Sequence, residues 1–526
     1  MKNFQRYIII VLVCSSLILI GYRITPEKKI ILEEQELPIV LNGIIFTAEN
    51  VGNVNEMEVF EKIESDLGIE VQFNQINNNE RILQKKYIMQ SNEIPDFIMG
   101  SNIPNRELLA YVNEEKIIPL DDLINSYAPH IQALFEEKPF VKQASTFLGD
   151  KIYTLPFYNE MKRDLVDNYL FINKTWLEEL ELEMPTTTEE FYQVLRAFKT
   201  QDPNKNGQMD EIPFSYIESN SKYNADSFIG AFGMVDNGKM IMIKDGEAKF
   251  VPGEEGYKEA ILYLRKLYQE ELLDAEIFTQ SLEQYIEKGK NEVPIVGAFI
   301  AKDSGIVVGE NRAIDNYVVV PPLEGPHGDR LWGKKVSQFS SNQFMITTKN
   351  QHPEMTIAWV DQFFNPDRAP EIVCGAEGVT IEKIEGNYYF LKPPKGKSYI
   401  EHAMENSAMP ACPGMLTKEI ESKFSYNPIV NRKNHWYNKY EPYFVKENIC
   451  VSNQFQIDFM KESGIQKSLN RYIYEMKTRW IAGQYSIEED WEKYQNTLKS
   501  LNADAYRILY ELKYNECKHL GEHMMH

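Results

Sequence analysis

The sequence has few cysteines, and none is spaced as a metal site or a CxxC motif requires. Five cysteines occur among 526 residues. Those beyond the N-terminal region are scattered along the chain, at Cys374, Cys412, Cys450 and Cys517. This spacing excludes zinc sites and CxxC chemistry. One or two disulfides and four free buried thiols are equally compatible with the distribution.

The sequence also lacks an excess of positive charge. Its formal net charge is −22, and no basic patch with interleaved aromatic residues occurs. Proteins that bind phosphate backbones need a basic surface, so we exclude a nucleic-acid partner. An acidic surface is typical of soluble extracytoplasmic proteins but also of many cytosolic ones, so the charge alone does not assign a compartment.

Motifs of common enzyme classes are missing as well. The sequence contains no GxSxG, no HExxH, no Walker loop and no GxGxxG before a helix. With 78 Asp and Glu residues, some carboxylate pairs must lie close together by chance, so glycoside hydrolysis stays open as an alternative. Internal repeats and low-complexity segments do not occur.

A long apolar run is found only at the N-terminus. It covers residues 7–22, follows a short basic region and precedes a charged, proline-bearing linker. This order is typical of an export signal, and the run is shorter than the roughly 20 residues of a full membrane span. Cys14 suggests a lipidated cysteine, although Val13 stands where such signals have a small residue. We expect residues 1–36 to direct export and to tether the protein, through either a lipidated Cys14 or an uncleaved anchor.

The remainder of the chain is globular in composition, with 43% hydrophobic and 12% aromatic residues, and its length predicts two or more domains or lobes. The first elements alternate between strand and helix, over residues 39–47, 56–67, 69–73, 81–91 and 95–100. This order predicts a parallel sheet covered by helices. Ligands collect at the carboxyl ends of such strands, which makes Ser101 and Asn102 candidate ligand residues.

Further elements follow the same logic. Strands are predicted over residues 149–158, 169–172, 294–301 and 317–321, with a strand pair over 333–348. Helices are predicted over residues 174–181, 189–200, 256–271, 279–289 and 355–364, and the chain is mostly helical after residue 451. Asn173 is placed to cap the helix that follows it, and Trp176 and Trp359 fall within helical patterns and are assigned to the core.

An oxygen-rich loop follows the predicted helix 189–200. Oxygen donors recur at alternate positions, and they are Asp202, Asn204, Asn206, the carbonyl of Gln208, Asp210 and Glu211. Gly207 supplies the tight turn that lets them converge on a hard cation such as Ca²⁺. An EF-hand needs a glutamate at the twelfth position, where Pro213 stands, so we expect a static clip rather than a switch. An ordinary Asn/Gly-rich turn is the alternative.

Aromatic residues beside polar groups are candidates for sugar contact. An aromatic face packs against the C–H face of a sugar, while amides and carboxylates bind its hydroxyls. Tyr158 and Asn159 follow a proline near a presumed crossover. Trp332 lies in a glycine-flanked stretch that we predict to be exposed.

Three segments together resemble the extracellular solute-binding proteins of carbohydrate ABC importers, within the subgroup of LipO-like lipoproteins and alginate-oligosaccharide-binding proteins. The segments are residues 169–177, 184–191 and 202–213. Glu377 lies where this family has a glycine–glutamate–glycine turn, and residues 480–510 match its C-terminal helices. The resemblance extends from residue 38 to about residue 515, and only the lipidation signal departs from it.

The resemblance implies an α/β fold of the periplasmic-binding-protein type (class II), with two lobes, a hinge, an interlobe cleft and extra C-terminal helices. The boundaries expected are an anchor and linker over 1–36, an N-terminal lobe over 37–154 and about 294–350, a C-terminal lobe over 155–293 and about 351–517, and a tail over 518–526. It also implies that the loop over 202–213 holds a structural Ca²⁺, with the six oxygen donors as ligands, and that Glu377 contacts the ligand.

The function implied is a membrane-tethered, extracytoplasmic receptor that delivers an oligosaccharide to an ABC permease, without catalysis and as a monomer. The net charge favours neutral or weakly charged sugars. Two alternatives stay open at this point. One is a calcium-stabilised enzyme acting on glycans, and the other is a sugar-sensing subunit of a membrane signalling system.

Overall fold

The computed structural model describes residues 38–49, 51–77, 80, 84, 87–88, 94–162, 165–236, 238–334, 338–395, 397, 399–409, 411–425, 428–447 and 464–519. The predicted anchor with Cys14, most of the predicted helix over 81–91, Cys450 and the end of the tail lie outside these residues. Within them, no helix is both long enough and apolar enough to cross a membrane. Cys374 and Cys412 are buried free thiols.

The first sheet has six strands in the order β14-β4-β11-β3-β1-β2. Its strands are β1 (Ile39–Thr47), β2 (Ile69–Asn77), β3 (Phe97–Met99), β4 (Leu155–Asn159), β11 (Gln338–Ile346) and β14 (Gly414–Leu416). β1 runs parallel to both β2 and β3, as predicted, whereas β11 is antiparallel to β3 and β4. β3 and β4 therefore point in the same direction, and their carboxyl ends lie on the same side of the sheet.

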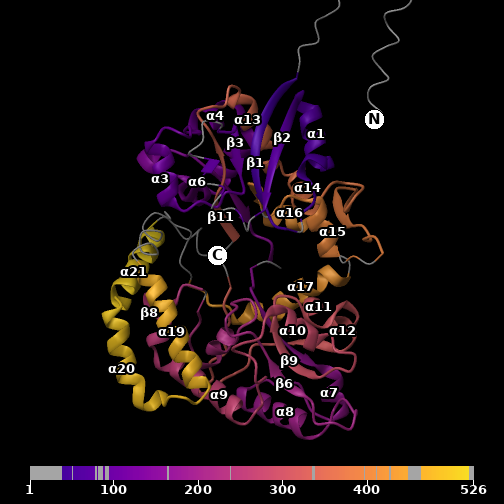
Figure 1. The fold of residues 1–526 in the computed structure, drawn as a ribbon, viewed down its shortest axis with the longest axis vertical. Coiled ribbons are helices and arrows are strands. Elements are labelled where there is room, and N and C mark those ends of the chain that lie inside the picture. Colours follow the sequence, from indigo (N-terminus) through magenta and orange to yellow (C-terminus); the bar gives the residue numbers. More distant parts are fainter. Residues whose placement is uncertain are drawn as a thin grey trace, which may run out of the picture. The chain divides into compact units, whose positions relative to one another are not determined.

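Helices pack around this sheet because each presents an apolar stripe. In α1 (Glu58–Leu67) the buried residues are Val59, Phe60 and Ile63, and the helix stops at Gly68, whose φ of +67° suits glycine. α1 packs against β2 (Figure 1). The other helices of this half are α3 (Asn105–Asn113), α4 (Asp121–Tyr127), α5 (Pro129–Glu137), α6 (Pro139–Ser145), α13 (Pro353–Asp361), α14 (Ala369–Cys374), α15 (Tyr399–Asn406) and α16 (Lys418–Ser422).

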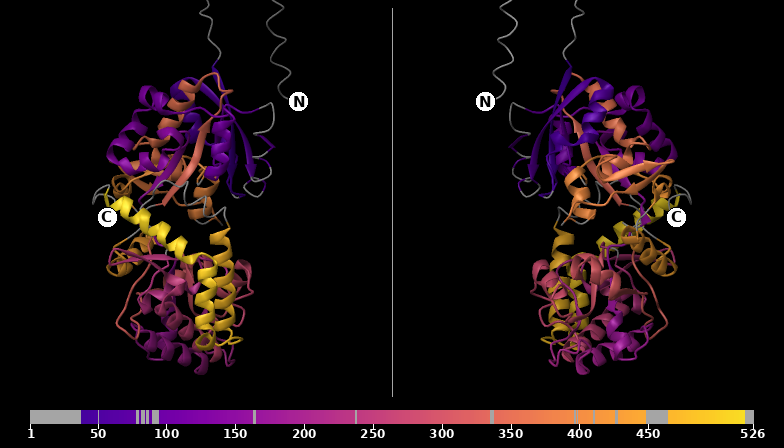
Figure 2. Two further views of the ribbon diagram at one scale, coloured as in Figure 1. Left: turned by 90° about the vertical axis from the view of Figure 1, so that its left-hand side faces the viewer. Right: turned by 90° about the vertical axis from the view of Figure 1, so that its right-hand side faces the viewer.

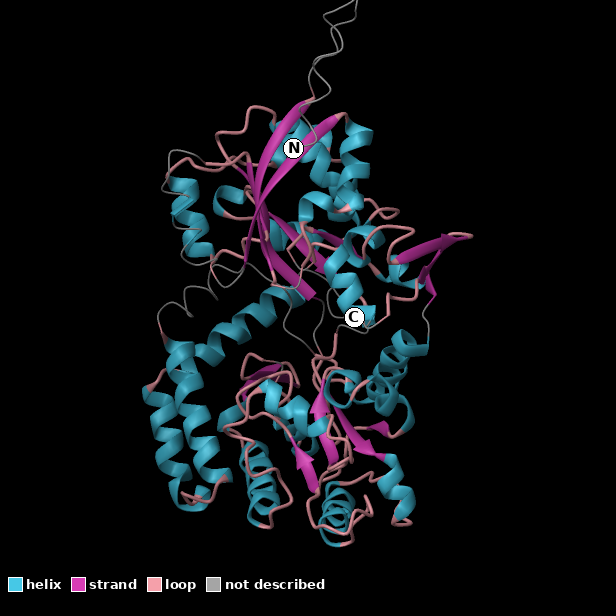
Figure 3. Cartoon of the chain, turned by 45° about the vertical axis from the view of Figure 1, so that its right-hand side comes forward, coloured by secondary structure: helices cyan, strands magenta, loops and turns pink. Residues whose placement is uncertain are grey.

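The second sheet has four strands in the order β10-β5-β9-β6. Its strands are β5 (Tyr169–Asn173), β6 (Ile212–Ser215), β9 (Val296–Ala301) and β10 (Tyr317–Val320). β5 and β9 are buried throughout, which explains their continuous apolar sequences. The helices of this half are α7 (Lys174–Glu179), α8 (Thr188–Thr200), α9 (Glu255–Gln269), α10 (Leu282–Gly289), α11 (Ser304–Val308) and α12 (Glu310–Asp315) (Figure 3).

Local signals at the helix starts act as the sequence predicts. The Asn173 side chain accepts hydrogen bonds from the backbone of Thr175 and Trp176 and caps α7. Thr187 and Glu190 form a capping box at the start of α8. The core assignments of Trp176 and Trp359 are confirmed, since their exposed fractions are 2% and 0%.

The described residues after 451 are mostly helical, as predicted, and form α19 (Ile465–Ile481), α20 (Ile487–Ser500) and α21 (Ala503–His519). The helix α17 (Pro428–Tyr440), which was not predicted, precedes them. α19 packs against α9, while α21 contacts the strand β8 (Glu247–Phe250) as well as α19 and α20. Figure 2 shows these C-terminal helices in yellow. Two small sheets complete the fold, β7 (Ile241–Lys244) with β8 (Glu247–Phe250), and β12 (Ile381–Ile384) with β13 (Asn387–Phe390) and β15 (Phe424–Ser425).

The predicted lobe boundaries need correction. β9 and β10 fall within the range 294–350 that was assigned to the N-terminal lobe, yet they pair with β5 in the second sheet. β4 and β14 were assigned to the C-terminal lobe and lie in the first sheet. The predicted strand pair over 333–348 is a single strand, β11, whose register shifts between Ser340 and Phe344. Strand pairing at long range decided these points, and local patterns carry no signal for it.

Candidate functional site

The oxygen-rich loop connects α8 to β6 and is curled by three residues with positive φ, Asp202, Lys205 and Gly207. The side-chain oxygens turn back onto the loop. The N–H of Asn206 donates to Asp202 Oδ1 (3.2 Å) and Asn204 Oδ1 (3.0 Å), and the N–H of Gly207 donates to Asp202 Oδ2 (3.0 Å). Oxygens of Asp202 and Asn204 thus meet at the N–H of Asn206.

The acidic end of the loop carries an unusual group. Both carboxylate oxygens of Glu211 are buried, and the backbone N–H groups of Glu211 and Asn204 interact with them. Burial raises the pKa of Glu211, and the nearby carboxylates of Asp202 and Asp210 add to this effect. A buried carboxylate is costly unless hydrogen bonds, a cation or a proton satisfy it.

The donor set suits a hard cation only if the asparagines take part. No group of three or more His, Cys, Asp or Glu side chains in the described ranges could hold a metal by itself. Asn204 and Asn206 point their amide nitrogens at Asp210, at 3.0–3.2 Å. Their amide oxygens accept from the backbone N–H groups of Asn206 (3.0 Å) and Gln208 (2.7 Å), so turning the amides over would break these two hydrogen bonds. The types of donor present, carboxylates, amide oxygens and a carbonyl, are those that bind Ca²⁺ in proteins.

A cavity of about 130 Å³ lies at one end of the strands of the second sheet. It is lined by residues from loops far apart in the sequence, namely Leu165, Asp167, Asn168, Ser221, Asn224, Asp226, Ser227, Val235, Asp236, Gly238, Gly333 and Lys334. β5 is antiparallel to β9 and β10, while β6 is parallel to β9. The carboxyl ends of β6, β9 and β10 therefore lie on the same side of the sheet as the amino end of β5. Ligands of α/β sheets bind outside the carboxyl ends of strands, which is the position of this cavity.

Asn168 joins the loops around the cavity. Its side chain accepts a hydrogen bond from Ser227 Oγ (2.6 Å) and donates one to the carbonyl of Ser221 (3.2 Å). Its own carbonyl accepts from the indole nitrogen of Trp332 (3.3 Å). Through its side chain and its backbone carbonyl, Asn168 thus connects the loop before β5, the loop after β6 and the segment that leads to Lys334.

Charged groups of both signs occupy the cavity wall. Asp236 accepts hydrogen bonds from the backbone of Gly238, Lys239 and Met240 at 2.8–3.1 Å, while burial raises its pKa. Burial lowers the pKa of Lys334. Carboxylates, amides, hydroxyls and an ammonium group together can donate to and accept from the hydroxyls of a sugar.

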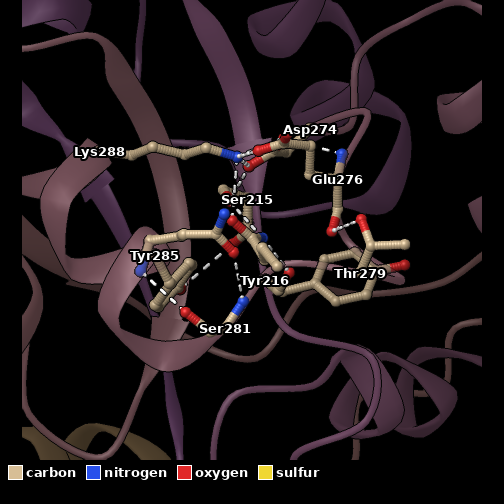
Figure 4. A network of polar contacts seen from close by, with 10 residues as sticks. Ser215, Tyr216, Asp274, Glu276, Thr279, Ser281, Tyr285 and Lys288 are labelled. Carbon is tan, nitrogen blue, oxygen red and sulfur yellow. Dashed lines mark hydrogen bonds and ion pairs between the residues drawn. The ribbon is translucent and has the colours of Figure 1, made fainter.

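A polar network holds the end of β6 that leads into the cavity loop (Figure 4). Lys288 Nζ binds both carboxylate oxygens of Asp274 (2.9 and 2.7 Å), and Asp274 accepts from Ser215 Oγ (2.7 Å). The Gln280 amide donates to the carbonyl of Tyr216 (2.8 Å). These contacts fix the start of the segment that carries Ser221, Asn224 and Asp226 into the wall.

Behind the wall lies a buried acid, Glu218. Its exposed fraction is 3%, and the ammonium group of Lys477 lies 2.5 Å from Glu218 Oε1. Burial raises the pKa of Glu218 to about 7, although Lys477 opposes the shift.

This raised pKa predicts a pH-dependent stability near neutrality. Folded Glu218 keeps its proton up to about pH 7, whereas the unfolded chain releases it near 4.5. The contribution of this proton to the free energy of unfolding is therefore fully present below the pKa of the unfolded chain. It is lost as pH rises through the pKa of folded Glu218. Relative to Glu218→Gln, the wild type is expected to lose up to about 3 kcal/mol of unfolding free energy between about pH 5 and about pH 8. Urea unfolding at both pH values measures this, and parallel pH profiles of the two proteins would contradict it.

Four of the predicted ligand residues lie at the carboxyl ends of β3 and β4 in the first sheet. Ser101 is fully buried and donates to the carbonyl of Asn342 (2.7 Å), and Asn102 accepts from the Gln343 side chain. Tyr158 is 1% exposed and donates to Glu160 (2.6 Å). The Asn159 side chain accepts from the N–H of Met161 (2.8 Å). These side chains are engaged within the protein.

The prediction of an exposed Trp332 is wrong. Its exposed fraction is 4%, and its ring packs edge-on against Tyr440 with the centroids 4.8 Å apart. The flanking glycine suggested exposure, but the surrounding core covers the indole. Glu377 is exposed and accepts a hydrogen bond from the N–H of Lys383 (3.3 Å). The structure does not bring Trp332 and Glu377 together with the other four candidates.

The cavity residues were missed by sequence reasoning. They are single Asn, Ser and Asp residues in loops, without a motif. The run of polar residues after β6, over 218–227, was the one available signal, since it follows the carboxyl end of a buried strand.

No protein-family model matches the chain. It is 27% identical over 489 residues to the fructooligosaccharide ABC transporter substrate-binding protein FusA of Streptococcus pneumoniae serotype 4, covering 88% of this chain and 87% of FusA. It is 30% identical over 258 residues to lipoprotein LipO of Bacillus subtilis, covering 46% and 49% of the two chains.

Solved structures agree with these relatives. FusA in complex with kestose superposes with a TM-score of 0.80 at 26% identity, covering 92% of this chain and all of that one. A FusA EF-hand mutant in complex with fructo-nystose gives the same TM-score, identity and coverage. The likeness therefore spans both sheets and the C-terminal helices.

Proposed function

We propose that this chain, which is similar in sequence and fold to the substrate-binding proteins of ABC transporters, captures an oligosaccharide outside the cytoplasm and presents it to the permease of an ABC importer. Its relatives are binding proteins, and the chain is a binding protein rather than an enzyme. The observation that carries the proposal is the match to FusA over 88% of the chain. The polar cavity at the carboxyl ends of the strands supports it.

We propose the cavity as one part of the sugar site. Its wall offers hydroxyl, amide and carboxylate groups at fixed positions, which suits a ligand with many hydroxyls. Neutral oligosaccharides are the class we favour, since the net charge of −22 opposes anionic ones and FusA is named for fructooligosaccharides.

A glycan array probed with the full-length protein in mild detergent tests the proposal, with kestose, nystose and oligogalacturonates among its members. The expected result is saturable binding of a neutral oligosaccharide, confirmed by calorimetry, with the sugar recovered unchanged. Conversion of the bound sugar to product would favour an enzyme instead. Binding of no array member would overturn the proposed function.

We further propose that the oxygen-rich loop holds Ca²⁺. The ligands would be the side chains of Asp202, Asn204, Asn206, Asp210 and Glu211 and the carbonyl of Gln208. The ion would neutralise the converging oxygens and stiffen the loop between α8 and β6. The support is the burial of both Glu211 oxygens beside the carboxylates of Asp202 and Asp210, together with the EF-hand named in the FusA mutant structure.

Calcium is expected to raise the melting temperature of the EDTA-treated protein. An ion at about 1,000 times its Kd stabilises by about 4 kcal/mol, and differential scanning calorimetry measures the shift. Asp202→Asn should abolish most of it, because the charge is lost while asparagine still tolerates the positive φ. Asp245→Asn is the matched control, since Asp245 also has a positive φ but lies in another turn. A wild type that does not respond to calcium would contradict the site.

We propose that residues 1–36 tether the protein to the membrane, through lipidated Cys14 or an uncleaved apolar segment. The support is the basic, then apolar, order of the N-terminal sequence. Membrane fractionation of the wild type and of Cys14→Ser separates the two forms of tether. Only a lipidated anchor is expected to be lost in the variant.

A further inference from the structure

A buried lysine on a C-terminal helix is linked to the cavity wall. Lys477 lies within α19, has an exposed fraction of 4%, and forms ion pairs with Glu218 and Asp226. Asp226 lines the cavity, whereas Glu218 lies behind it. We propose that Lys477 is a positioning residue of the ligand site, which holds the Asp226 carboxylate in place as a hydrogen-bond acceptor for a sugar hydroxyl. This inference rests on the proposed function.

Asp226 is held from two directions. Lys477 Nζ binds its Oδ1, and the Asn224 side chain donates to its Oδ2. Asn224 also accepts from the N–H of Asp226 (3.4 Å) and caps the 3-10 helix η4 (Ala225–Phe232). The side chain of Asp226 remains 35% exposed. A carboxylate has about four acceptor positions, so two fixed contacts orient it and leave capacity for a ligand hydroxyl.

Lys477 is needed because two carboxylates share this location. The Glu218 side chain is only 1% exposed, and its second oxygen has no hydrogen-bond partner among the described residues. Without the ammonium group, Asp226 would face a second acid across a poorly solvated space. The repulsion would turn Asp226 away from its present position or favour its protonated form. Either change alters the acceptor that the cavity wall presents.

The burial of the charges points to a role beyond stability. Buried ion pairs are weak evidence of stabilisation, because well-packed apolar replacements are often neutral or better. Here one of the two acids lines the cavity, and the lysine comes from a helix that does not. α19 thereby contributes to the site although none of its residues lines the cavity.

Two variants separate positioning from stability. Lys477→Met should lower the melting temperature, because the buried Glu218 side chain loses the group that lies 2.5 Å from its Oε1. In Lys477→Met combined with Glu218→Gln, the buried acid is gone and the melting temperature should recover. The affinity for the sugar should not recover, because the Asp226 carboxylate still lacks the ammonium group of Lys477 that orients it. We expect the double variant to bind about tenfold or more weakly, as for a lost hydrogen bond to a charged group.

The assay is calorimetry with the neutral oligosaccharide that the wild type binds best on the glycan array. Arg432→Met serves as control, because Arg432 is another poorly exposed cation, paired with Asp303 and Glu310, and does not line the cavity. It should lower stability and leave affinity unchanged. A double variant with wild-type affinity overturns the inference alone. A wild type that binds no array member overturns the proposed function and this inference together.

Discussion

Replacing Trp359 with alanine is expected to lower the free energy of unfolding by about 3–5 kcal/mol, the range for buried tryptophan truncations. The indole has an exposed fraction of 0% and lies among rings from α1, β2 and β3. Its centroid is 6.1 Å from that of Phe60, 5.9 Å from Phe73 and 5.3 Å from Phe97. Alanine would leave a cavity in the hydrophobic core beside the first sheet, and the tightly packed rings around it cannot move in to fill the space. Urea unfolding followed by circular dichroism measures the loss.

The matched control is Trp359→Phe. It keeps an aromatic ring in the core and removes the indole N–H, which has no hydrogen-bond partner among the described residues. We expect this change to cost less than about 1.5 kcal/mol, as for other near-conservative core changes. Equal unfolding midpoints for Trp359→Ala and the wild type would show that this cluster does not stabilise the first half.

Replacing Gly230 with alanine should cost about 3 kcal/mol or more, because the new methyl group meets backbone atoms. A Cβ at this position would lie 1.9 Å from the carbonyl oxygen of Leu331. The two segments are also joined by the hydrogen bond from the Leu331 N–H to the Gly230 carbonyl (3.1 Å). Relief of the overlap requires η4 to move away from residues 331–332, which breaks this contact.

The same movement should weaken sugar binding. η4 carries Ser227, and the segment after residue 332 carries Gly333 and Lys334, all of which line the cavity. Gly253→Ala is the control, since its nearest neighbours lie at 3.5 Å or more and its φ is not positive. It should change stability by at most about 1 kcal/mol. Melting temperatures and calorimetric titrations of both variants test the expectation, and a Gly230→Ala protein as stable as the control would contradict it.

Much of the secondary structure could be predicted because its causes are local. The strand over 39–47 is β1, with the predicted limits. Asn173 and Thr187 start their helices through bonds within three residues of themselves. The oxygen-rich loop is equally local, since alternate side chains and one glycine determine its curl. In each case the interacting groups are neighbours in the sequence.

The lobe boundaries and the aromatic contacts could not be predicted in the same way. β4 and β10 were placed in the wrong halves because pairing partners lie far along the chain. Trp332 was predicted to be exposed from its flanking glycine, whereas Tyr440, distant in sequence, covers it. Burial of a side chain depends on what packs over it, and a single sequence does not state that.

The sequence by itself determined the order of the first elements, β1, α1 and β2, the Asn173 cap, the oxygen-rich loop and a resemblance to solute-binding proteins. Only the tertiary structure decided which strands share a sheet, where the polar cavity lies and that Lys477 reaches Asp226 across 251 positions. The physical reason is the range of the interactions. Caps and turns close over a few residues, whereas sheets, cavities and buried ion pairs form between segments that meet only after the chain has folded.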